Sequence, residues 1–236
     1  MNTPLKKRLT NTWLHPRYLA TLYMRLAIAD MSPRMSGTVL DVGCGRRQYE
    51  DLFRATASRY WGVDSPASQA AAEPHIIGDA LQIPIRSASV DNVLATELIE
   101  HLPNPDRFLA DVSRVLRHGG YLLLSAPLFE PLHEEPRDYF RFTLHGLRAL
   151  LASHGFVEVS TSRKGGWWSV VLGSLVCQAL YETASPLRGD GTRGRWLLGV
   201  LVLPLCALLQ FAAYLGDRVA PGARCTLGYV VLARKE

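Results

Sequence analysis

Short apolar runs alternate with amphipathic stretches along the middle of this 236-residue chain. Runs rich in Val, Ile and Leu are typical of strands buried in a parallel sheet, and the stretches between them have the apolar spacing of helices. The pattern predicts strands at residues 39–42, 60–63, 75–77, 90–95, 121–125 and 157–160, and a closing strand at 226–233. It predicts helices at 48–57, 105–116 and 144–153, and glycines at 119–120 and 155 as stops after the last two. We therefore expect an α/β fold with a doubly wound, seven-stranded, mainly parallel sheet.

Two longer apolar runs, at residues 165–181 and 196–216, separate the sixth strand from the closing one. Neither run contains a charged residue, and the second has the length of about 20 residues that spans a bilayer, although Pro204 would kink it. The loop between them contains Arg188 and two further arginines, which a spanning hairpin would have to carry across the membrane. We favour a helical pair that dips into one leaflet or lies along it. A spanning hairpin and a pair buried in a core or a dimer interface stay open.

The N-terminal segment has helical spacing of apolar residues, namely Leu19, Leu22, Tyr23 and Leu26, with Arg17 and Arg25 on another face. This pattern indicates either a helix at a membrane interface or a helix packed over the mouth of a catalytic domain. The same arginines interrupt every apolar run, so we expect no secretory signal. The expected organisation is an N-terminal segment at 1–35, a core at 36–162, an apolar insertion at 163–224 and a closing strand at 225–236.

Charge is distributed unevenly around a net value of +5. Residues 1–38 and 163–236 are each net basic by five charges, and residues 39–162 are net acidic by five. An acidic core argues against nucleic acid as a partner, and basic flanks beside apolar sequence favour an anionic membrane surface. The four cysteines form no Cys-x-x-Cys pair, which argues against a zinc cluster or a disulfide framework, and we predict no metal site.

The most informative motif is Val-Leu-Asp-Val-Gly-Cys-Gly at residues 39–45, a strand that ends in a Gly-x-Gly turn. Glycines there let backbone N–H groups approach a ligand at the carboxyl end of the strand, where open α/β sheets bind ligands. The dinucleotide fingerprint Gly-x-Gly-x-x-Gly is broken at Gln48, which disfavours a nicotinamide-dependent oxidoreductase.

Acidic residues follow the next two predicted strands. Asp64 ends the second strand, where a carboxylate can accept hydrogen bonds from both hydroxyls of a ribose. Asp79 and Ala80 follow the third strand, where side chain and backbone can contact an adenine ring. The fourth strand then runs into a polar turn that contains Glu97. In combination these features indicate a site for an adenosine-containing ligand.

With these motifs, residues 36–162 and the last strand resemble the class I S-adenosylmethionine-dependent methyltransferases, in the small-molecule, type 11-like branch. The resemblance includes the stretch at 114–125 and implies a Rossmann-like fold with S-adenosylmethionine as cofactor. The cofactor-binding residues that it implies are Asp41, Gly43, Cys44, Gly45, Asp64, Asp79, Ala80 and Glu97.

Candidates for the acceptor side lie after the fourth and fifth strands. His101 is either a general base or a structural hydrogen-bonding group. The segment at 133–143 is rich in His, Asp, Tyr and Arg and resembles a lid found in a branch of these enzymes. Its His133 and Tyr139 are further candidate catalytic residues. Asp138 and Arg141 would either bind a polar headgroup or pair with each other to hold the loop.

The sequence therefore predicts a methyltransferase that acts on a small-molecule, lipid or lipid-linked acceptor at a membrane surface. We expect it in the cytoplasm, peripheral or monotopic on the inner face of the membrane, with its oligomeric state left open. The alternative is a catalytically silent, membrane-associated scaffold that still binds S-adenosylmethionine.

Overall fold

The computed structural model describes residues 12–65, 74–184, 193–220, 222 and 224–236. Lys6, Lys7 and Arg8 of the predicted basic segment lie outside these residues, as does Arg188 of the loop between the apolar runs. The described chain divides into two compact units. A sheet unit contains Arg25–Leu128, Leu132–Ser162 and Gly228–Glu236, and a helical unit contains 12–24, Phe129–Pro131 and Arg163–Leu227.

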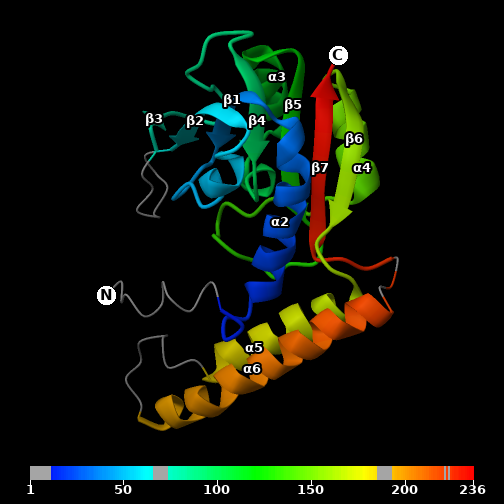
Figure 1. The fold of residues 1–236 in the computed structure, drawn as a ribbon. Coiled ribbons are helices and arrows are strands. Elements are labelled where there is room, and N and C mark those ends of the chain that lie inside the picture. Colours follow the sequence, from blue (N-terminus) through cyan, green and yellow to red (C-terminus); the bar gives the residue numbers. More distant parts are fainter. Residues whose placement is uncertain (1–11, 66–73, 185–192, 221, 223) are drawn as a thin grey trace. The chain divides into compact units, whose positions relative to one another are not determined.

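The sheet unit is built on seven strands in the order β3-β2-β1-β4-β5-β7-β6 (Figure 1). Neighbouring strands from β3 to β5 are parallel, and β7 pairs with β5 in the antiparallel direction. The strands are β1 (Gly37–Val42), β2 (Ala57–Asp64), β3 (Ile76–Ile77), β4 (Val90–Ala95), β5 (Leu116–Pro127), β6 (Phe156–Arg163) and β7 (Gly228–Lys235). The predicted Rossmann-like fold with a seven-stranded, mainly parallel sheet is confirmed.

Helices cover both faces of this sheet, α2 (Tyr18–Met31) on one face and α3 (Pro105–Val115) and α4 (Leu144–Ala152) on the other (Figure 1). Local sequence starts α3, because the side chain of Asn104 accepts a hydrogen bond from the Arg107 amide and Pro105 occupies the first turn. Phe108 and Val112 of α3 are fully buried against the strands. Burial of apolar side chains of this size contributes about 1.5–3 kcal/mol each.

The predicted helix at 48–57 is wrong. The structure has one 3₁₀ turn there, η2 (Glu50–Phe53), and Ala57 already belongs to β2. Ala57 pairs with Gly37 of β1, so the sheet ladder draws the end of the predicted helix into an extended conformation. Tertiary pairing overrides local helix propensity at this point.

Gly119 and Gly120 were predicted to stop a helix, but they lie inside β5. The ladder between β4 and β5 shifts register between Val90 and Asn92, opposite these glycines. A Cβ atom on Gly120 would lie 2.6 Å from the carbonyl oxygen of Asp91, so the close approach of two backbones requires glycine. Gly155, with φ of 76°, does follow α4 as predicted.

The buried stripe of α2 agrees with the predicted one at Leu19 but not at Leu26. Met24, Ala27, Ile28 and Met31 are buried, at the spacing expected for one helix face. Leu26, which was assigned to the apolar face, is 53% exposed.

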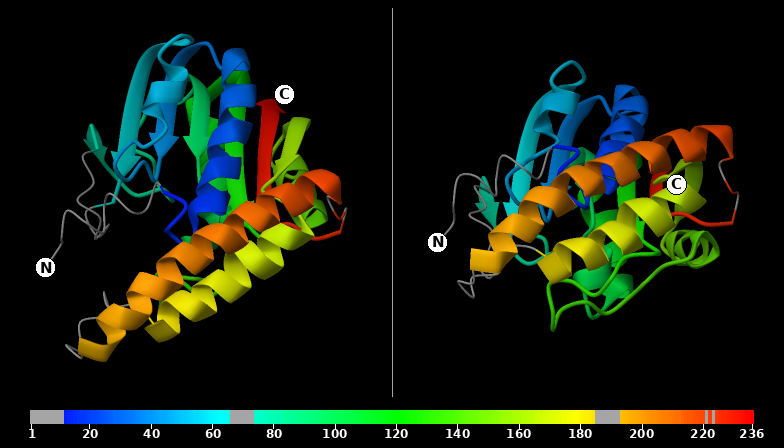
Figure 2. Two further views of the ribbon diagram at one scale, coloured as in Figure 1. Left: turned by 60° about the horizontal axis from the view of Figure 1, so that its bottom comes forward. Right: turned by 90° about the horizontal axis from the view of Figure 1, so that it is seen from below.

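The helical unit contains a hairpin made from the two long apolar runs (Figure 2). One arm is a π-helical segment, η4 (Ser169–Val176), continued by α5 (Cys177–Ala184), and the other is α6 (Arg193–Val219). The carboxylate of Asp217 on α6 accepts hydrogen bonds from the amides of Gly166, Trp168 and Ser169, and so satisfies the N–H groups at the start of the other arm.

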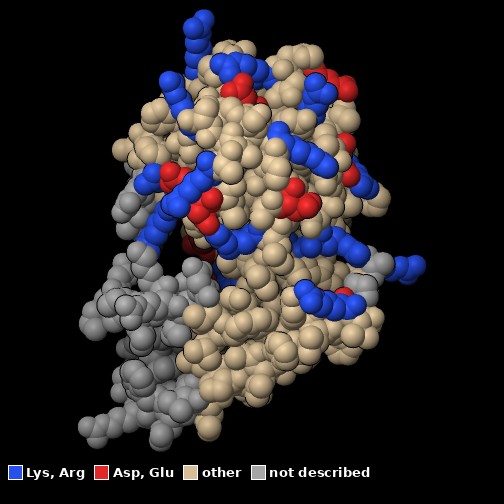
Figure 3. All heavy atoms as spheres, in the orientation of Figure 1, with Lys and Arg blue, Asp and Glu red and all other residues tan. Residues whose placement is uncertain are grey.

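One face of α6 exposes large apolar side chains at intervals of three or four residues. They are Leu201, Leu205, Leu208, Phe211, Leu215 and Val219. Among the described residues, Leu201–Val219 is the one helical stretch that is long and apolar enough to cross a membrane. On the face drawn in Figure 3, the described part of the hairpin carries few charged side chains.

The chain leaves the sheet for the helical unit and returns to it at the same edge. The amide of Glu236, after β7, donates to the carbonyl of Gly155, before β6, so the two strands run in opposite directions. At the other end of the pair, the amide of Leu227 donates to the carbonyl of Lys164. The insertion is therefore closed at its base by backbone hydrogen bonding.

Candidate active site

A cavity of 440 Å³ lies at the carboxyl ends of β1, β2 and β4 in the sheet unit. This is the edge where open α/β sheets bind ligands. Its lining joins residues from five separate chain segments: Val42, Gly43, Gly45, Val63, Asp64, Ser65, Gly78, Asp79, Ala80, Leu81, Glu97, Leu98, His101, Leu102, Pro103, Glu134 and Arg137.

The glycine turn after β1 forms one wall of the cavity. Gly43 and Gly45 have φ angles of 72° and 50°, which favour glycine, and a Cβ atom on Gly43 would lie 2.9 Å from Leu98. The amides of Gly43 and Cys44 both donate to the carbonyl of Val63, which fastens the turn to β2. At Gly43 and Gly45 this wall therefore consists of backbone atoms, which are held in a fixed position.

Asp64 ends β2 and faces this turn. One of its carboxylate oxygens accepts the Gly45 amide at 2.7 Å, and the other accepts the Ser65 amide at 2.7 Å. Each oxygen can accept a further hydrogen bond, so the carboxylate is oriented to receive two neighbouring hydroxyl groups. The structure therefore places Asp64 in the cavity lining beside the glycine turn.

Asp79 and Ala80 line the cavity beyond β3, next to Asp64 in the lining. The carboxylate of Asp79 accepts the Leu81 amide at 2.9 Å and closes a tight turn. Ala80 and Leu81 give this end of the cavity an apolar wall suited to a flat ring.

Asp41 and Cys44, two of the predicted cofactor-binding residues, do not line the cavity. Both are buried, Asp41 within β1 and Cys44 in the glycine turn itself. The hydroxyl of Tyr60 donates to Asp41 at 2.6 Å, and the second oxygen of that carboxylate has no hydrogen-bond partner among the described residues. Burial raises the pKa of Asp41 to about 7, although the hydrogen bond from Tyr60 opposes the shift.

Glu97 lines the cavity after β4 and has a φ of 48°, a left-handed conformation that non-glycine residues rarely adopt. Ser125, buried at the end of β5, holds it there. The Glu97 amide donates to the Ser125 hydroxyl at 2.9 Å, and that hydroxyl donates to the Glu97 carboxylate at 2.8 Å. Sequence reasoning did not assign Ser125 a role, although its position at a strand end was a usable signal.

His101, Glu134 and Arg137 also line the cavity. His101 ends the 3₁₀ turn η3 (Ile99–His101) after β4, and its Nδ1 donates to the carbonyl of Arg137 at 2.6 Å. Its ring meets the ring of His133 edge to face, with centroids 4.9 Å apart. The predicted lid segment therefore contacts the turn after β4.

Asp138 and Arg141 form a two-pronged ion pair, with N–O distances of 2.6 and 2.8 Å. Hydrogen bonds from Arg141 hold the pKa of Asp138 below its usual range. Asp138 also accepts the His133 amide at 3.0 Å, so the pair braces the loop.

Four of the predicted acceptor-side residues do not line the cavity, namely His133, Asp138, Tyr139 and Arg141. The backbone amide of Tyr139 donates to the Glu100 carbonyl, and its side chain is 47% exposed.

The raised pKa of Asp41 makes stability depend on pH. The folded protein retains this proton up to about pH 7, whereas the unfolded chain loses it near 3.8, so the folded state binds more protons between these values. The free energy of unfolding should therefore fall as pH rises through this window. Asp41→Asn should remove this fall, which amounts to on the order of 4 kcal/mol.

Urea unfolding of both proteins across the window measures the difference. Asp51→Asn is the matched control, because hydrogen bonds from Arg25 lower the pKa of Asp51 and its contribution should grow with rising pH at the acidic end. A pH-independent difference between wild type and Asp41→Asn would contradict the assignment.

Residues 40–124 match the family model of the methyltransferase domain. A protein of Mycobacterium tuberculosis (strain H37Rv), described as a probable S-adenosylmethionine-dependent methyltransferase, is 32% identical over 164 residues. The match covers 64% of this chain and 57% of that protein, so the chain spans less than two thirds of this relative's length.

Solved structures show the same fold. A S-adenosylmethionine-dependent methyltransferase of Archaeoglobus fulgidus covers 92% of this chain and 94% of its own, with a TM-score of 0.56 and 16% identity. The cyclase SpnF covers 89% of this chain and 80% of its own, with a TM-score of 0.55 and 19% identity. The family match identifies residues 40–124 as a methyltransferase domain, and the solved structures show that the fold is shared with S-adenosylmethionine-dependent methyltransferases.

Proposed function

We propose that the protein transfers a methyl group from S-adenosylmethionine to a small-molecule, lipid or lipid-linked acceptor at the cytosolic face of a membrane. One observation carries this proposal: Gly43, Gly45, Asp64 and Asp79 line the same cavity as His101 and two residues of the 133–143 segment. Such a cavity holds a donor along the strand ends and brings its reactive end toward the acceptor side.

The reaction mainly requires that the acceptor atom be aligned with the methyl carbon of the donor. The acceptor atom attacks the methyl carbon in line, the bond from sulfur to that carbon breaks, and its electron pair stays on sulfur. A proton on the acceptor passes to a nearby base or to water. Asp64 would bind the ribose and the turn backbone the methionine end, while Glu97, held by Ser125, borders the space between donor and acceptor.

The helical unit supports action at a membrane. The exposed face of α6 carries large apolar side chains from Leu201 to Leu215, and Trp167, Trp168 and Leu175 expose further apolar surface on the same unit. A continuous apolar surface of this kind is unusual for a protein face that contacts only water. Basic residues flank the two apolar runs at 165–181 and 196–216, and they would interact favourably with an anionic membrane surface.

Connectivity links this unit to the cavity edge. Because β7 is antiparallel to β5 and starts at Gly228 opposite Pro127, the chain returns from the insertion at the carboxyl end of β5. This is the edge at which the cavity lies. An anchor attached there favours an acceptor taken from the bilayer.

A silent scaffold that only binds the donor is the second candidate. The fold alone leaves it open, since the similar structure of SpnF is named a cyclase. Complete donor-binding geometry with no methyl transfer to any cellular acceptor would favour it.

Asp64→Ala tests donor binding. Losing two hydrogen bonds to a charged group should weaken S-adenosylmethionine binding by about 100-fold or more, as measured by isothermal titration calorimetry. Asp106→Ala is the control, because Asp106 is an exposed carboxylate outside the cavity lining. Unchanged affinity in a folded Asp64→Ala protein would refute the assigned ribose site.

The acceptor class is tested by incubating the enzyme and methyl-labelled S-adenosylmethionine with a whole-cell extract, followed by partition between organic and aqueous phases. We expect label in the organic phase and none with Asp64→Ala. Label confined to the aqueous phase would contradict a membrane-borne acceptor. Donor binding without any label would support the scaffold.

Membrane association is tested by flotation with vesicles of phosphatidylcholine and phosphatidylglycerol. The triple substitution Leu201→Ser, Leu208→Ser and Phe211→Ser should reduce vesicle binding about tenfold or more, because each exposed side chain loses apolar transfer energy. Ile77→Ser with Val157→Ser, which removes exposed apolar side chains from the sheet unit, should leave binding unchanged. Equal binding by the triple variant would exclude α6 as the membrane contact.

A further inference from the structure

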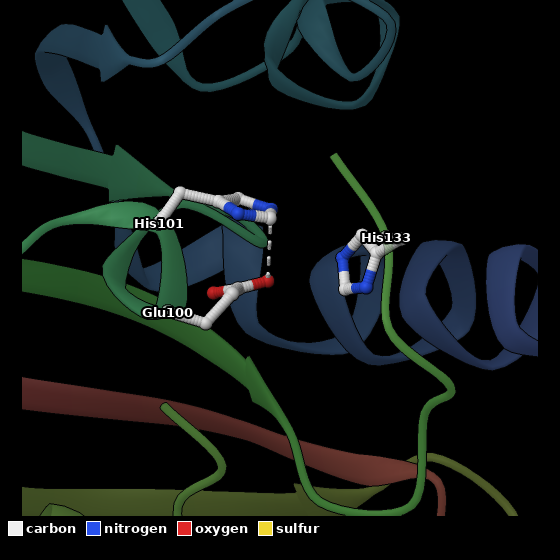
Figure 4. A group of neighbouring side chains, drawn as sticks. All are labelled: Glu100, His101 and His133. Atoms are coloured by element: carbon white, nitrogen blue, oxygen red, sulfur yellow. Dashed lines mark ion pairs between the residues drawn. The ribbon is translucent and has the colours of Figure 1, made fainter. Parts of the chain in front are cut away.

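Glu100, His101 and His133 bring three ligand atoms together in the sheet unit (Figure 4). One carboxylate oxygen and one nitrogen from each imidazole all lie within 4.8 Å of one another. Glu100 and His101 come from the turn η3, and His133 comes from the segment after β5. Two distant parts of the sequence therefore converge on one small space.

The hydrogen bonding of His101 fixes which nitrogen faces this space. Its Nδ1 lies 2.6 Å from the carbonyl oxygen of Arg137, and because a carbonyl can only accept, Nδ1 carries the proton. The neutral ring then has a lone pair on Nε2, which lies 3.8 Å from a Glu100 carboxylate oxygen. Metal-binding histidines commonly donate their other ring N–H to a backbone carbonyl in this way.

The distance from Nε2 to the carboxylate oxygen suits an ion between them. It is too long for a hydrogen bond. Two ligand atoms that each lie about 2.0–2.2 Å from one ion are separated by about 3–4 Å, depending on the angle at the ion.

The segments that carry the other two ligands are held in place. Asp138, which is itself paired with Arg141, accepts the backbone amide of His133 at 3.0 Å. Glu100 is fully buried, and its backbone carbonyl accepts the amides of Tyr139 and Phe140.

From this geometry we infer that Glu100, His101 and His133 bind a divalent transition-metal ion of the class of Zn²⁺, Mn²⁺, Fe²⁺ or Co²⁺. Two imidazoles and one carboxylate suit these ions, whereas Mg²⁺ and Ca²⁺ are usually bound through oxygen alone. Three protein ligands leave coordination positions for an outside group. The absence of cysteine pairs in the sequence does not bear on this site, because its ligands are His and Glu.

The ion's role rests on the proposed function. His101 lines the cavity in which the proposed reaction takes place, so the ion would border that cavity. It would bind an oxygen of the acceptor and stabilise its deprotonated form, with the proton released to water, before that oxygen attacks the methyl carbon. The site thus favours acceptors that carry a hydroxyl group, and it orients them without a side chain acting as the base.

The test is binding of Co²⁺ to the untagged full-length protein, followed by calorimetry and by the visible absorption of the bound ion. We expect one ion per chain, with His133→Ala and Glu100→Gln each weakening binding about tenfold or more. His154→Ala is the matched control, because His154 has the same 14% side-chain exposure as His133 and also lies 3.8 Å from a carboxylate, that of Asp106. It should bind Co²⁺ as the wild type does.

Each other outcome overturns the inference. Absence of Co²⁺, Zn²⁺ and Mn²⁺ binding by folded wild-type protein refutes the site, as does unchanged binding by both His133→Ala and Glu100→Gln. S-adenosylmethionine binding is measured on the same samples. Wild-type protein that binds S-adenosylmethionine but not the ion refutes the metal site alone, whereas absence of donor binding in the wild type refutes the proposed function.

Discussion

The pairing of β7 with β5 is the constraint on which the rest of the structure depends. Leu122, Leu123 and Leu124 lie opposite Ala233, Leu232 and Val231, and all six side chains are fully buried. A strand this deeply buried cannot be displaced, so everything between β6 and β7 must leave and return at one edge of the sheet. The hydrogen bond from Leu227 to Lys164 closes that excursion. An apolar insertion is tolerated because the sheet is complete without it.

Inside the insertion, polar groups give apolar helices a defined arrangement. Gln210 of α6 donates to the carbonyls of Trp13 and His15 and accepts the Leu19 amide, all within the helical unit. The carboxylate of Asp217 likewise fixes the start of the other arm, because it accepts the amide of Gly166 just before η4. Two helices with only apolar surface can slide or rotate against each other at little cost, whereas a buried carboxylate or amide is satisfied in one register. This division leaves the outer face of α6 apolar while the inner face specifies the packing.

Sequence patterns predicted the parts of the molecule that depend on local periodicity and strand ends. The strand at Val90–Ala95 has the predicted bounds, and Asp64 ends β2 as expected. The predicted helix at 48–57 was wrong because pairing across the sheet decided the conformation of Ala57. Asp41 was expected to contact the donor, and its position outside the cavity lining follows from the hydroxyl of Tyr60, whose partner no spacing rule reveals. The meeting of His101 with His133 depends on the path of a loop, which periodicity does not encode.

Two sides of the cavity are built in different ways, and this difference bears on specificity. On the side of the glycine turn, backbone groups and the Asp64 carboxylate, fixed by two amides, are set by the sheet itself. Around His101, side chains come from a short turn and from a loop braced by the Asp138–Arg141 pair. Substitutions in that loop can change its shape and charge without disturbing the sheet, because none of its residues belongs to a strand. Similar folds can therefore keep one donor and carry out different reactions, and the chemistry of the acceptor must be inferred from the residues around Glu100, His101 and His133.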